Sequence, residues 1–498
     1  MSKEKRTHRF QILKGSKDYK SLCGLCNLSA NMYNSTLYIL RNLYFASFPK
    51  NGNTPQFYLE QIDENFRRYI VSNEYNYKSK KDGTEKTITF YSIEYPSSSG
   101  GKHTNEKAFY TIFSNNNHTD YRSIQVSAAR NAVKNAVKDM KSFTESVKKY
   151  HKNSSNFSGY PKLPNYKKVN PSGFKMNTFT IDNFRIGDDR SITINGDVHL
   201  KNVYIPEYID RNDVKQIRVV PKLTMDVFIV EVIYEKSIEN DIINRTNVMS
   251  IDMGIDVVCA VTDMNGNAIL VSGKPLKGIN DHYNHKISEL QKIYSHTNTF
   301  TGKKSRMYER KRTNKIHTAM HQITRFLVDQ AVATGCGTII IGKNDGWKQN
   351  TTGKKVAGDN GDIVKTKSHL NKKNRRKFTA IPFNKLISQL KYKANEYNIN
   401  VVEIEESYTS KCSALDNEDI SKHDEYCGKR SGKHNKTFTT KDGRIIHADI
   451  NGSLNILRRG TKKNINPDGI NPDGNYQNPI KINTIGKESY KKWVQKQM

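Results

Sequence analysis

Cysteines and long apolar runs are scarce in this chain of 498 residues. Six cysteines are too few for a disulfide framework in a chain of this length, so we expect a reduced, cytoplasmic protein. No run approaches the roughly 20 apolar residues that a transmembrane helix needs, and the charged first residues lack the apolar core of a secretory signal. The sequence therefore predicts no membrane segment, and its length predicts about two to four structural units.

Acidic residues are also few relative to basic ones. Lysine and arginine together number 81, against 49 aspartates and glutamates, which leaves a formal net charge of +32. This imbalance favours a polyanionic partner, most commonly nucleic acid, although an AT-rich genome also enriches lysine and asparagine. The hydrophobic fraction of 35% is low, but the 10% of aromatic residues argues against a wholly disordered chain.

The first half of the chain predicts a helical region followed by a small β-structure. A helix at about residues 19–47 follows a short N-terminal strand, and residues 51–118 are polar and read as irregular. Residues 179–234 alternate with a period of two and contain the turn signal Asn195-Gly196. This alternation predicts a small antiparallel barrel that the N-terminal strand completes.

A second helix is the clearest element of that half. Apolar residues recur every three or four positions from Val126 to Val147 and define one face. The other face fits equally a solvated surface and a surface that contacts nucleic-acid phosphates. It carries Lys134, Lys138, Lys141, Lys148 and Lys149.

From residue 248 onward the pattern changes again. Three hairpin-linked strands are followed by helix, strand, helix, strand and helix, which is the order of a ribonuclease-H-like domain. The predicted fold is therefore multidomain α+β: a helical lobe and a small antiparallel barrel, then a ribonuclease-H-like α/β domain with a small insertion. The tail after residue 460 contains two tandem Asn-Pro-Asp-Gly turns, and we expect it to be mobile or draped on the surface.

Acidic residues stand at the ends of three elements in that last region. Asp252 ends the first strand, Asp449 begins the last helix, and Glu405 and Glu406 end a later strand. In such a fold these ends meet at one edge of the sheet, where ionised carboxylates repel one another unless a cation lies between them. Carboxylates suit Mg²⁺ or Mn²⁺, and two such ions can promote phosphodiester hydrolysis. For Asp449 taken alone, a helix N-cap is the simpler interpretation.

Three segments carry a resemblance to a known family. Residues 250–256 (Ser-Ile-Asp-Met-Gly-Ile-Asp) resemble the first RuvC motif of transposon-encoded TnpB proteins and of the related compact type V CRISPR effectors. Residues 405–413 resemble the family's segment with the pattern ESYTSK-C-S, and residues 447–456 resemble its third RuvC motif. The resemblance covers roughly residues 246–460.

The resemblance implies an RNA-guided DNA endonuclease of subtype F, acting in a prokaryotic cytoplasm without a membrane. Its partners would be a guide RNA and target DNA, double-stranded and single-stranded, and the resemblance leaves open a homodimer on one guide. A TnpB nuclease guided by transposon-derived RNA and a nuclease-inactive RNA-guided DNA-binding protein are the alternatives. The implied parts are a first wedge strand (1–18), a helical recognition domain (19–175), a wedge barrel (176–245), a RuvC domain (246–406 and 447–460), a target-nucleic-acid-binding insertion (407–446) and a tail (461–498).

The middle catalytic glutamate is where this chain departs from the commoner pattern. Many relatives place it after the fourth strand, but residues 340–349 contain no glutamate. The chain resembles the branch in which this acid lies on the neighbouring strand, which we expect to be adjacent to the strand of Asp252. We therefore assign the role to Glu405, with Glu406 as the alternate, because strand alternation and its place near the strand end favour Glu405. Asp252, Glu405 and Asp449 would then hold Mg²⁺ or Mn²⁺.

Two further features concern zinc and nucleic acid. Relatives often carry Cys-x-x-Cys zinc knuckles between the last two motifs, but only Cys412 and Cys427 remain here, so we predict no zinc. Basic residues and a tryptophan near the carboxylates are predicted to contact nucleic acid, with a solvated run and a buried ring as the alternatives. They are Arg306, Arg310, Arg312, Lys372, Lys373, Arg375, Arg376 and Trp347.

Overall fold

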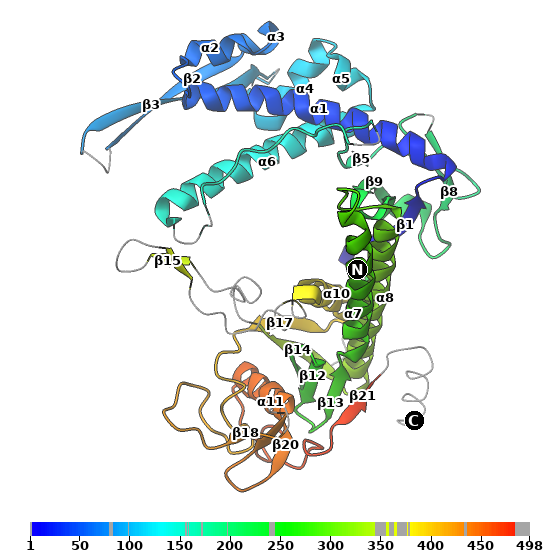
Figure 1. Cartoon of the computed structure of the whole chain (residues 1–498), viewed down its shortest axis with the longest axis vertical. Coiled ribbons are helices and arrows are strands. Elements are labelled where there is room, and N and C mark those ends of the chain that lie inside the picture. The colour runs from blue at the N-terminus through cyan, green and yellow to red at the C-terminus, as the bar shows by residue number, and fades with distance from the viewer. Residues whose placement is uncertain are drawn as a thin grey trace. The chain divides into compact units, whose positions relative to one another are not determined.

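The computed structural model describes residues 2–78, 83–97, 99–154, 157, 159–170, 173–196, 198–238, 245–343, 355–357, 363–365, 376, 379–432 and 436–483. The chain is mixed α+β and divides into two compact units, Lys3–Ser237 and Ile238–Met498, the latter together with the first two residues (Figure 1). No helix in these ranges is both long enough and apolar enough to cross a membrane.

Two long helices, α1 (Lys17–Ser47) and α6 (Val126–Lys152), pack along each other in the first unit. On α6, Val133, Met140 and Phe143 of the predicted apolar face are buried, and the predicted lysines of the other face are exposed. Four short helices belong to the same unit: α2 (Pro55–Glu60), α3 (Glu64–Arg67), α4 (Asn105–Asn115) and α5 (Thr119–Arg122).

A three-stranded antiparallel sheet lies within the segment that the sequence predicted to be irregular, so that prediction was wrong. The strands are β2 (Ile70–Lys78), β3 (Glu85–Pro96) and β4 (Lys102–Thr104), in that order. Most side chains of β2 are exposed, including Tyr75, so no buried apolar alternation marks this strand. Its cross-strand pairs, such as Asn76 with Thr87, involve polar side chains instead.

The segment predicted to form a barrel contains β5 (Phe179–Ile181), β6 (Arg185–Ile186), β7 (Ser191–Ile194), β8 (Val198–Tyr204), β9 (Val214–Lys222) and β10 (Val227–Ile238), with single 3-10 turns at Arg211–Asp213 and Leu223–Met225. Together with β1 (Ser2–Leu13), these strands form two sheets, β1-β10-β9-β5 and β6-β7-β8. The N-terminal strand joins the first sheet as predicted, but the described strands do not close into a barrel. Closure depends on pairing between edge strands, which alternation within a single strand does not specify.

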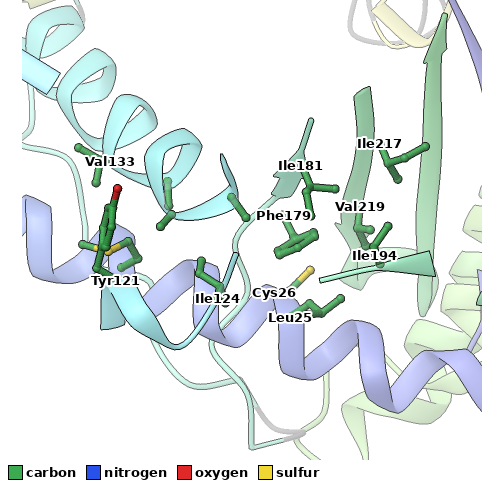
Figure 2. Close-up of a cluster of buried hydrophobic side chains, with 14 of the residues drawn as sticks. Leu25, Cys26, Tyr121, Ile124, Val133, Phe179, Ile181, Ile194, Ile217 and Val219 are labelled. Atoms are coloured by element: carbon green, nitrogen blue, oxygen red, sulfur yellow. The ribbon is translucent and has the colours of Figure 1, made fainter. Parts of the chain in front are cut away.

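One hydrophobic core joins the helices of this unit to its strands. Leu25 and Cys26 of α1 pack with Phe179 of β5 and Val219 of β9, and the cluster extends to Val133 of α6 (Figure 2). Cys26 is fully buried in this core. The helical and β parts predicted as separate domains therefore share a core.

The second unit is built on a six-stranded sheet with the order β17-β14-β11-β12-β13-β21. Its first three strands in sequence are linked by hairpins, and helices separate the later ones, as the pattern predicts. β11 pairs antiparallel with β12 and parallel with β14, and β14 pairs parallel with β17. The strands are β11 (Asn247–Asp252), β12 (Val257–Asp263), β13 (Ala268–Ser272), β14 (Cys336–Gly342), β17 (Asn400–Ile404) and β21 (Ile480–Ile482).

Helices cover both faces of this sheet. Ile251 of β11 packs in a core with residues of α8 (Lys303–Ala333) and α10 (Phe383–Asn395), and α7 (Lys274–Ser295) packs along α8. On the opposite face, α11 (Ala448–Thr461) lies against β11 and β12. Small two- and three-stranded pieces complete the unit: β15 (Lys355–Ala357) with β16 (Ile363–Lys365), and β18 (Lys429–Ser431), β19 (Thr437–Thr439) and β20 (Ile445–His447).

The described part of the C-terminal tail is a structural element of this unit. β21 pairs with β13 and adds a strand to the edge of the sheet. The tandem turns hydrogen-bond the β12–β13 hairpin, where Asn475 Oδ1 accepts from the Ala268 amide at 2.6 Å. Ile470 and Tyr476 are buried in the core beneath α11. The tail up to residue 483 is therefore integrated into the fold rather than mobile or merely draped on it.

Candidate active site

Asp252 is the last residue of β11, and alternation along this strand points it to the face that α11 covers. Ser250, two residues earlier on the same face, lies with its Oγ 3.0 Å from Ser453 Oγ of α11. The helix approaches the strand closely because Gly452 has no side chain: a Cβ there would lie 2.5 Å from Asp252 Oδ2. The small residues of α11 thus leave space for the Asp252 carboxylate.

Asp449 lies in the first turn of α11, but it is not the N-cap. The N-cap is His447, whose Nδ1 accepts a hydrogen bond from the Asp449 amide at 3.2 Å. The simpler interpretation of Asp449 as a helix cap is therefore wrong. Its carboxylate is partly exposed and lies 3.9 Å from His447 Nδ1.

The two candidate glutamates point in different directions. β17 ends at Ile404, and Glu405 is exposed, with its Oε1 accepting a hydrogen bond from Ser407 at 2.5 Å. Glu406 is partly buried and lies over the end of β14, where a Cβ on Gly342 would be 3.1 Å from Glu406 Oε2. The geometry favours the alternate, Glu406, as the residue that faces the site.

Sheet order adds a correction to the expected surroundings of these glutamates. β14 lies between β11 and β17, so the strand that ends before Glu405 is not adjacent to the strand of Asp252. Glu403, inside β17 and two residues before Glu405, is paired with Lys343 and Lys391 at 2.6 Å each. That face of the strand is engaged in surface ion pairs.

Electrostatics link three carboxylates. Burial, together with the negative charges of Asp449 and Glu406, raises the pKa of the Asp252 carboxyl to about 8, while the positive charge of Arg430 acts in the opposite direction. Burial also raises the pKa of Glu406 to about 7. The charges of Asp449 and Glu406 therefore lie close enough to Asp252 to act on its carboxyl.

Two buried asparagines position the loop that carries Glu406, and the sequence analysis missed them. Asn451 Nδ2 donates to the Cys412 carbonyl at 2.8 Å, and Asn455 Nδ2 donates to the carbonyls of Thr409 and Cys412 at 2.9 and 2.7 Å. Arg459 Nη1 donates to the Glu405 carbonyl at 2.8 Å. Two asparagines four positions apart, and therefore on one face of the helix, were the signal for this role.

The donor chemistry of the cluster fits a hard divalent cation. Carboxylate oxygens are the ligands that Mg²⁺ and Mn²⁺ prefer, and a cation between such groups offsets both the burial and the carboxylate repulsion that raise the pKa of Asp252. Within the described ranges, no three His, Cys, Asp or Glu side chains already converge as a set of metal ligands. The carboxylate chemistry of Asp252, Glu406 and Asp449 nevertheless suits such an ion.

The cysteines considered for zinc lie in different environments. Cys412 is buried with its Sγ 3.5 Å from the Ser421 carbonyl, and Cys427 is exposed. His423 Nε2 lies 2.8 Å from the Asp419 carbonyl. The absence of zinc stays a prediction.

The residues predicted to bind nucleic acid fall into three groups. The five predicted lysines of α6 are exposed, and Lys148 pairs with Glu145 at 3.0 Å. Arg306 and Arg310 are partly exposed, whereas Arg312 donates to Asn280 Oδ1 of α7 at 2.7 Å and therefore also joins two helices. Arg376 is exposed. Outside the described residues lie Trp347, Lys372, Lys373 and Arg375.

An unpredicted cavity of about 530 Å³ lies in the first unit between α1, α6 and residues 161–167. Lys167 Nζ lies 4.3 Å from the centre of the Tyr33 ring, and the Tyr33 hydroxyl donates to Asp139 at 2.7 Å. Tyr166, which also lines the cavity, stacks under Arg41 at 4.8 Å. Alternating lysines, prolines and a tyrosine in 161–167 were the only sequence signal for it.

Two protein-family models match segments of this chain that lie mainly in the second unit. A family model described as Cas12f1-like, TNB domain matches residues 383–456, and a model described as probable transposase, OrfB_IS605, matches residues 231–348. The first range contains Glu406 and Asp449, and the second contains Asp252. TnpB-like protein ORF457 of Acidianus two-tailed virus is 24% identical over 220 residues, which are 43% of this chain and 41% of the relative.

Two solved structures of CRISPR effectors match most of this chain, but at low sequence identity and low TM-score. The Cas12f1-sgRNA-target DNA complex matches at 13% identity with a TM-score of 0.43, covering 91% of this chain and 83% of that one. The mini-RNA-guided endonuclease CRISPR-Cas_phi3 matches at 12% identity with a TM-score of 0.36, covering 92% of each chain. The matches together confirm the resemblance to TnpB-related type V effectors. The chain spans about two fifths of the length of the curated TnpB-like relative.

Proposed function

We propose that this chain is an RNA-guided DNA endonuclease with one metal-dependent RuvC site formed by Asp252, Glu406 and Asp449. The observation that carries the proposal is the placement of the three carboxylates: Asp252 ends β11 against Gly452 of α11, Asp449 lies in the first turn of that helix, and Glu406 lies over the end of the adjacent β14. The sheet order β13-β12-β11-β14-β17, with α11 against β11, supports a ribonuclease-H-like domain. The family models on either side of the insertion support the same class of enzyme.

The proposed chemistry is phosphodiester hydrolysis. When bound, Mg²⁺ or Mn²⁺ would lower the pKa of an attacking water and stabilise the charge that develops on the leaving oxygen. Asp252, Glu406 and Asp449 would hold the ion. Gly452 leaves the space that Asp252 occupies, and Asn451 and Asn455 hold the loop that presents Glu406.

The proposed partners are a guide RNA and target DNA. A net charge of +32 and the exposed lysine face of α6 support binding to phosphate backbones. In such an enzyme, base pairing with the guide selects the sequence while the protein contacts the backbone. The solved Cas12f1 complex contains an sgRNA and target DNA as the partners of its own protein.

The TnpB-type nuclease is the second candidate. The match of residues 231–348 to the probable transposase model favours it, whereas the match of residues 383–456 to the Cas12f1-like model favours a CRISPR effector. The neighbouring genes distinguish the two: a CRISPR effector lies beside a repeat array, and a TnpB protein lies at a transposon end. The retention of all three carboxylates argues against a nuclease-inactive binding protein.

A pair of adjacent variants tests the proposed active site. Glu406→Gln keeps the size of the side chain and removes its charge. A neutral amide costs less to bury than a carboxylate, so we expect a folded protein. Its target cleavage should fall by at least about 100-fold, because one ligand of the metal is lost. Glu405→Gln is the matched control and should cleave within about threefold of the parent chain, since Glu405 is exposed. The measurement is plasmid cleavage in Mg²⁺ by the chain purified with RNA from its own locus.

The reverse pattern would overturn the assignment. An inactive Glu405→Gln protein with an active Glu406→Gln protein would return the role to Glu405, as strand alternation suggests. Full cleavage by both variants, or by the parent chain in excess EDTA, would contradict a metal site at this position.

A further inference from the structure

Two histidines lie one turn apart on α8, outside the carboxylate cluster. His317 and His321 are at i and i+4, positions that share one face of a helix. Their Nε2 atoms are 3.3 Å apart, and the ring centroids are 4.4 Å apart with 52° between the ring planes. Both side chains are partly exposed, so solvent ions have access to the pair.

The separation of the two nitrogens matches the bite of a metal chelate. Zinc binds imidazole nitrogen at about 2.0–2.1 Å with tetrahedral angles, which places two nitrogens of one ion about 3.3–3.4 Å apart. In the metal-free protein the two Nε2 atoms are at hydrogen-bond distance from each other, and a shared ion would replace that contact.

We propose that His317 and His321 chelate a divalent transition-metal ion, with Zn²⁺ as the reference ion. Neutral imidazole is a common ligand for Zn²⁺, Ni²⁺ and Cu²⁺, whereas Mg²⁺ prefers oxygen. Among the described residues no third His, Cys, Asp or Glu side chain joins the pair, so the proposed protein ligands are these two imidazoles. The site is separate from the proposed cleavage site in residues and in metal class, and it does not depend on the proposed function.

The surroundings preorganise this turn of α8. Lys393 of α10 donates to the His321 carbonyl at 2.7 Å and to Thr324 Oγ1 at 2.8 Å, which fixes the helix backbone at the second ligand. The next turn carries Arg325, paired with Asp329 at 2.7 Å. Two histidines on a fixed helix turn lose less conformational entropy on binding than two on a loop, while the nearby cations oppose an entering ion. We therefore expect moderate affinity.

Zinc titration of the full chain tests the proposal. The chain is stripped with EDTA and titrated with ZnCl₂ by calorimetry in excess Mg²⁺, which occupies oxygen-rich sites. We expect one zinc equivalent that is weakened at least about tenfold in His317→Gln and in His321→Gln. His285→Gln, which alters an exposed histidine paired with Glu289 on α7, and Cys412→Ser should keep that equivalent.

The outcomes are decisive in either direction. Loss of the same equivalent in both glutamine variants, with the controls unchanged, supports the chelate. Equal zinc binding by the parent chain and both variants overturns it, as does a parent chain that binds no zinc. Glutamine has good helix propensity, and circular dichroism checks folding; if one variant misfolds, the other decides the result. The test uses no cleavage assay, so failure of the proposed nuclease function would not affect it.

Discussion

Asp252→Asn should stabilise the metal-free protein at high pH while it abolishes cleavage. In the fold, burial and the charges of Asp449 and Glu406 raise the pKa of the Asp252 carboxyl from 3.8 to about 8. At about 1.4 kcal/mol per tenfold change, this rise corresponds to at most about 6 kcal/mol of destabilisation once Asp252 is ionised. Because Asp252 is partly accessible to water, we expect about half of that.

The sign follows from which state binds the proton more tightly. Between about pH 4 and pH 8 the folded protein keeps a proton on Asp252 that the unfolded chain has lost, so the free energy of unfolding falls as pH rises through this range. Asparagine carries no charge, so the free energy of unfolding of the Asp252→Asn protein does not fall in this way as pH rises. The advantage of Asp252→Asn is therefore near zero at pH 4 and greatest above pH 8.

Thermal unfolding in EDTA at pH 5 and pH 9 measures this difference. About 3 kcal/mol corresponds to a rise in Tm of about 6–12 °C for a unit of this size, and we expect it at pH 9 but largely not at pH 5. Glu405→Gln is the control and should change neither value. A lower Tm for Asp252→Asn at pH 9, or an equal shift at both pH values, would refute the account of Asp252 as a buried, repelled carboxylate.

Two further predictions concern space and charge. Gly452→Ala should lower cleavage about 100-fold without loss of RNA binding, because the added Cβ would lie 2.5 Å from Asp252 Oδ2. Gly278→Ala meets no atom within 4 Å, and a cleavage defect of the same size there would contradict this reasoning. The affinity for guide RNA should fall with salt at a log–log slope of about −0.7 to −0.9 per phosphate contact. Replacing Lys134, Lys138 and Lys141 with glutamine should reduce that slope by about 2, and a salt-independent affinity would contradict phosphate binding.

Several features of this protein follow from local sequence alone. The apolar run before Asp252 and the helical periodicity after Asp449 place each acid at the end of an element, and the structure shows both elements. The face of α6 and the Asn195-Gly196 turn were equally predictable. These features depend on the period of side chains within one element and on the backbone preference of single residues, which a sequence displays directly.

Other features depended on contacts between distant segments. The exposed β2–β3 hairpin has few buried side chains, so burial patterns could not predict it. Whether the first-unit strands close into a barrel, and whether the tail adds β21 to the sheet edge, depends on pairing between strands far apart in the chain. Such pairing leaves no periodic signal in either partner.

The choice between Glu405 and Glu406 shows the same limit at a single residue. Alternation with a period of two holds only inside a strand, and β17 ends at Ile404, before both glutamates. The first letter of the ESYTSK segment is Glu406, and this was the one sequence signal in its favour. Beyond Ile404 the direction of each side chain depends on a turn that Asn455 holds by the Thr409 carbonyl, 46 residues away in sequence. The sequence determined which carboxylates were available near the sheet edge, and the packing of α11 against that turn decided that Glu406 lies over the end of β14 while Glu405 is exposed.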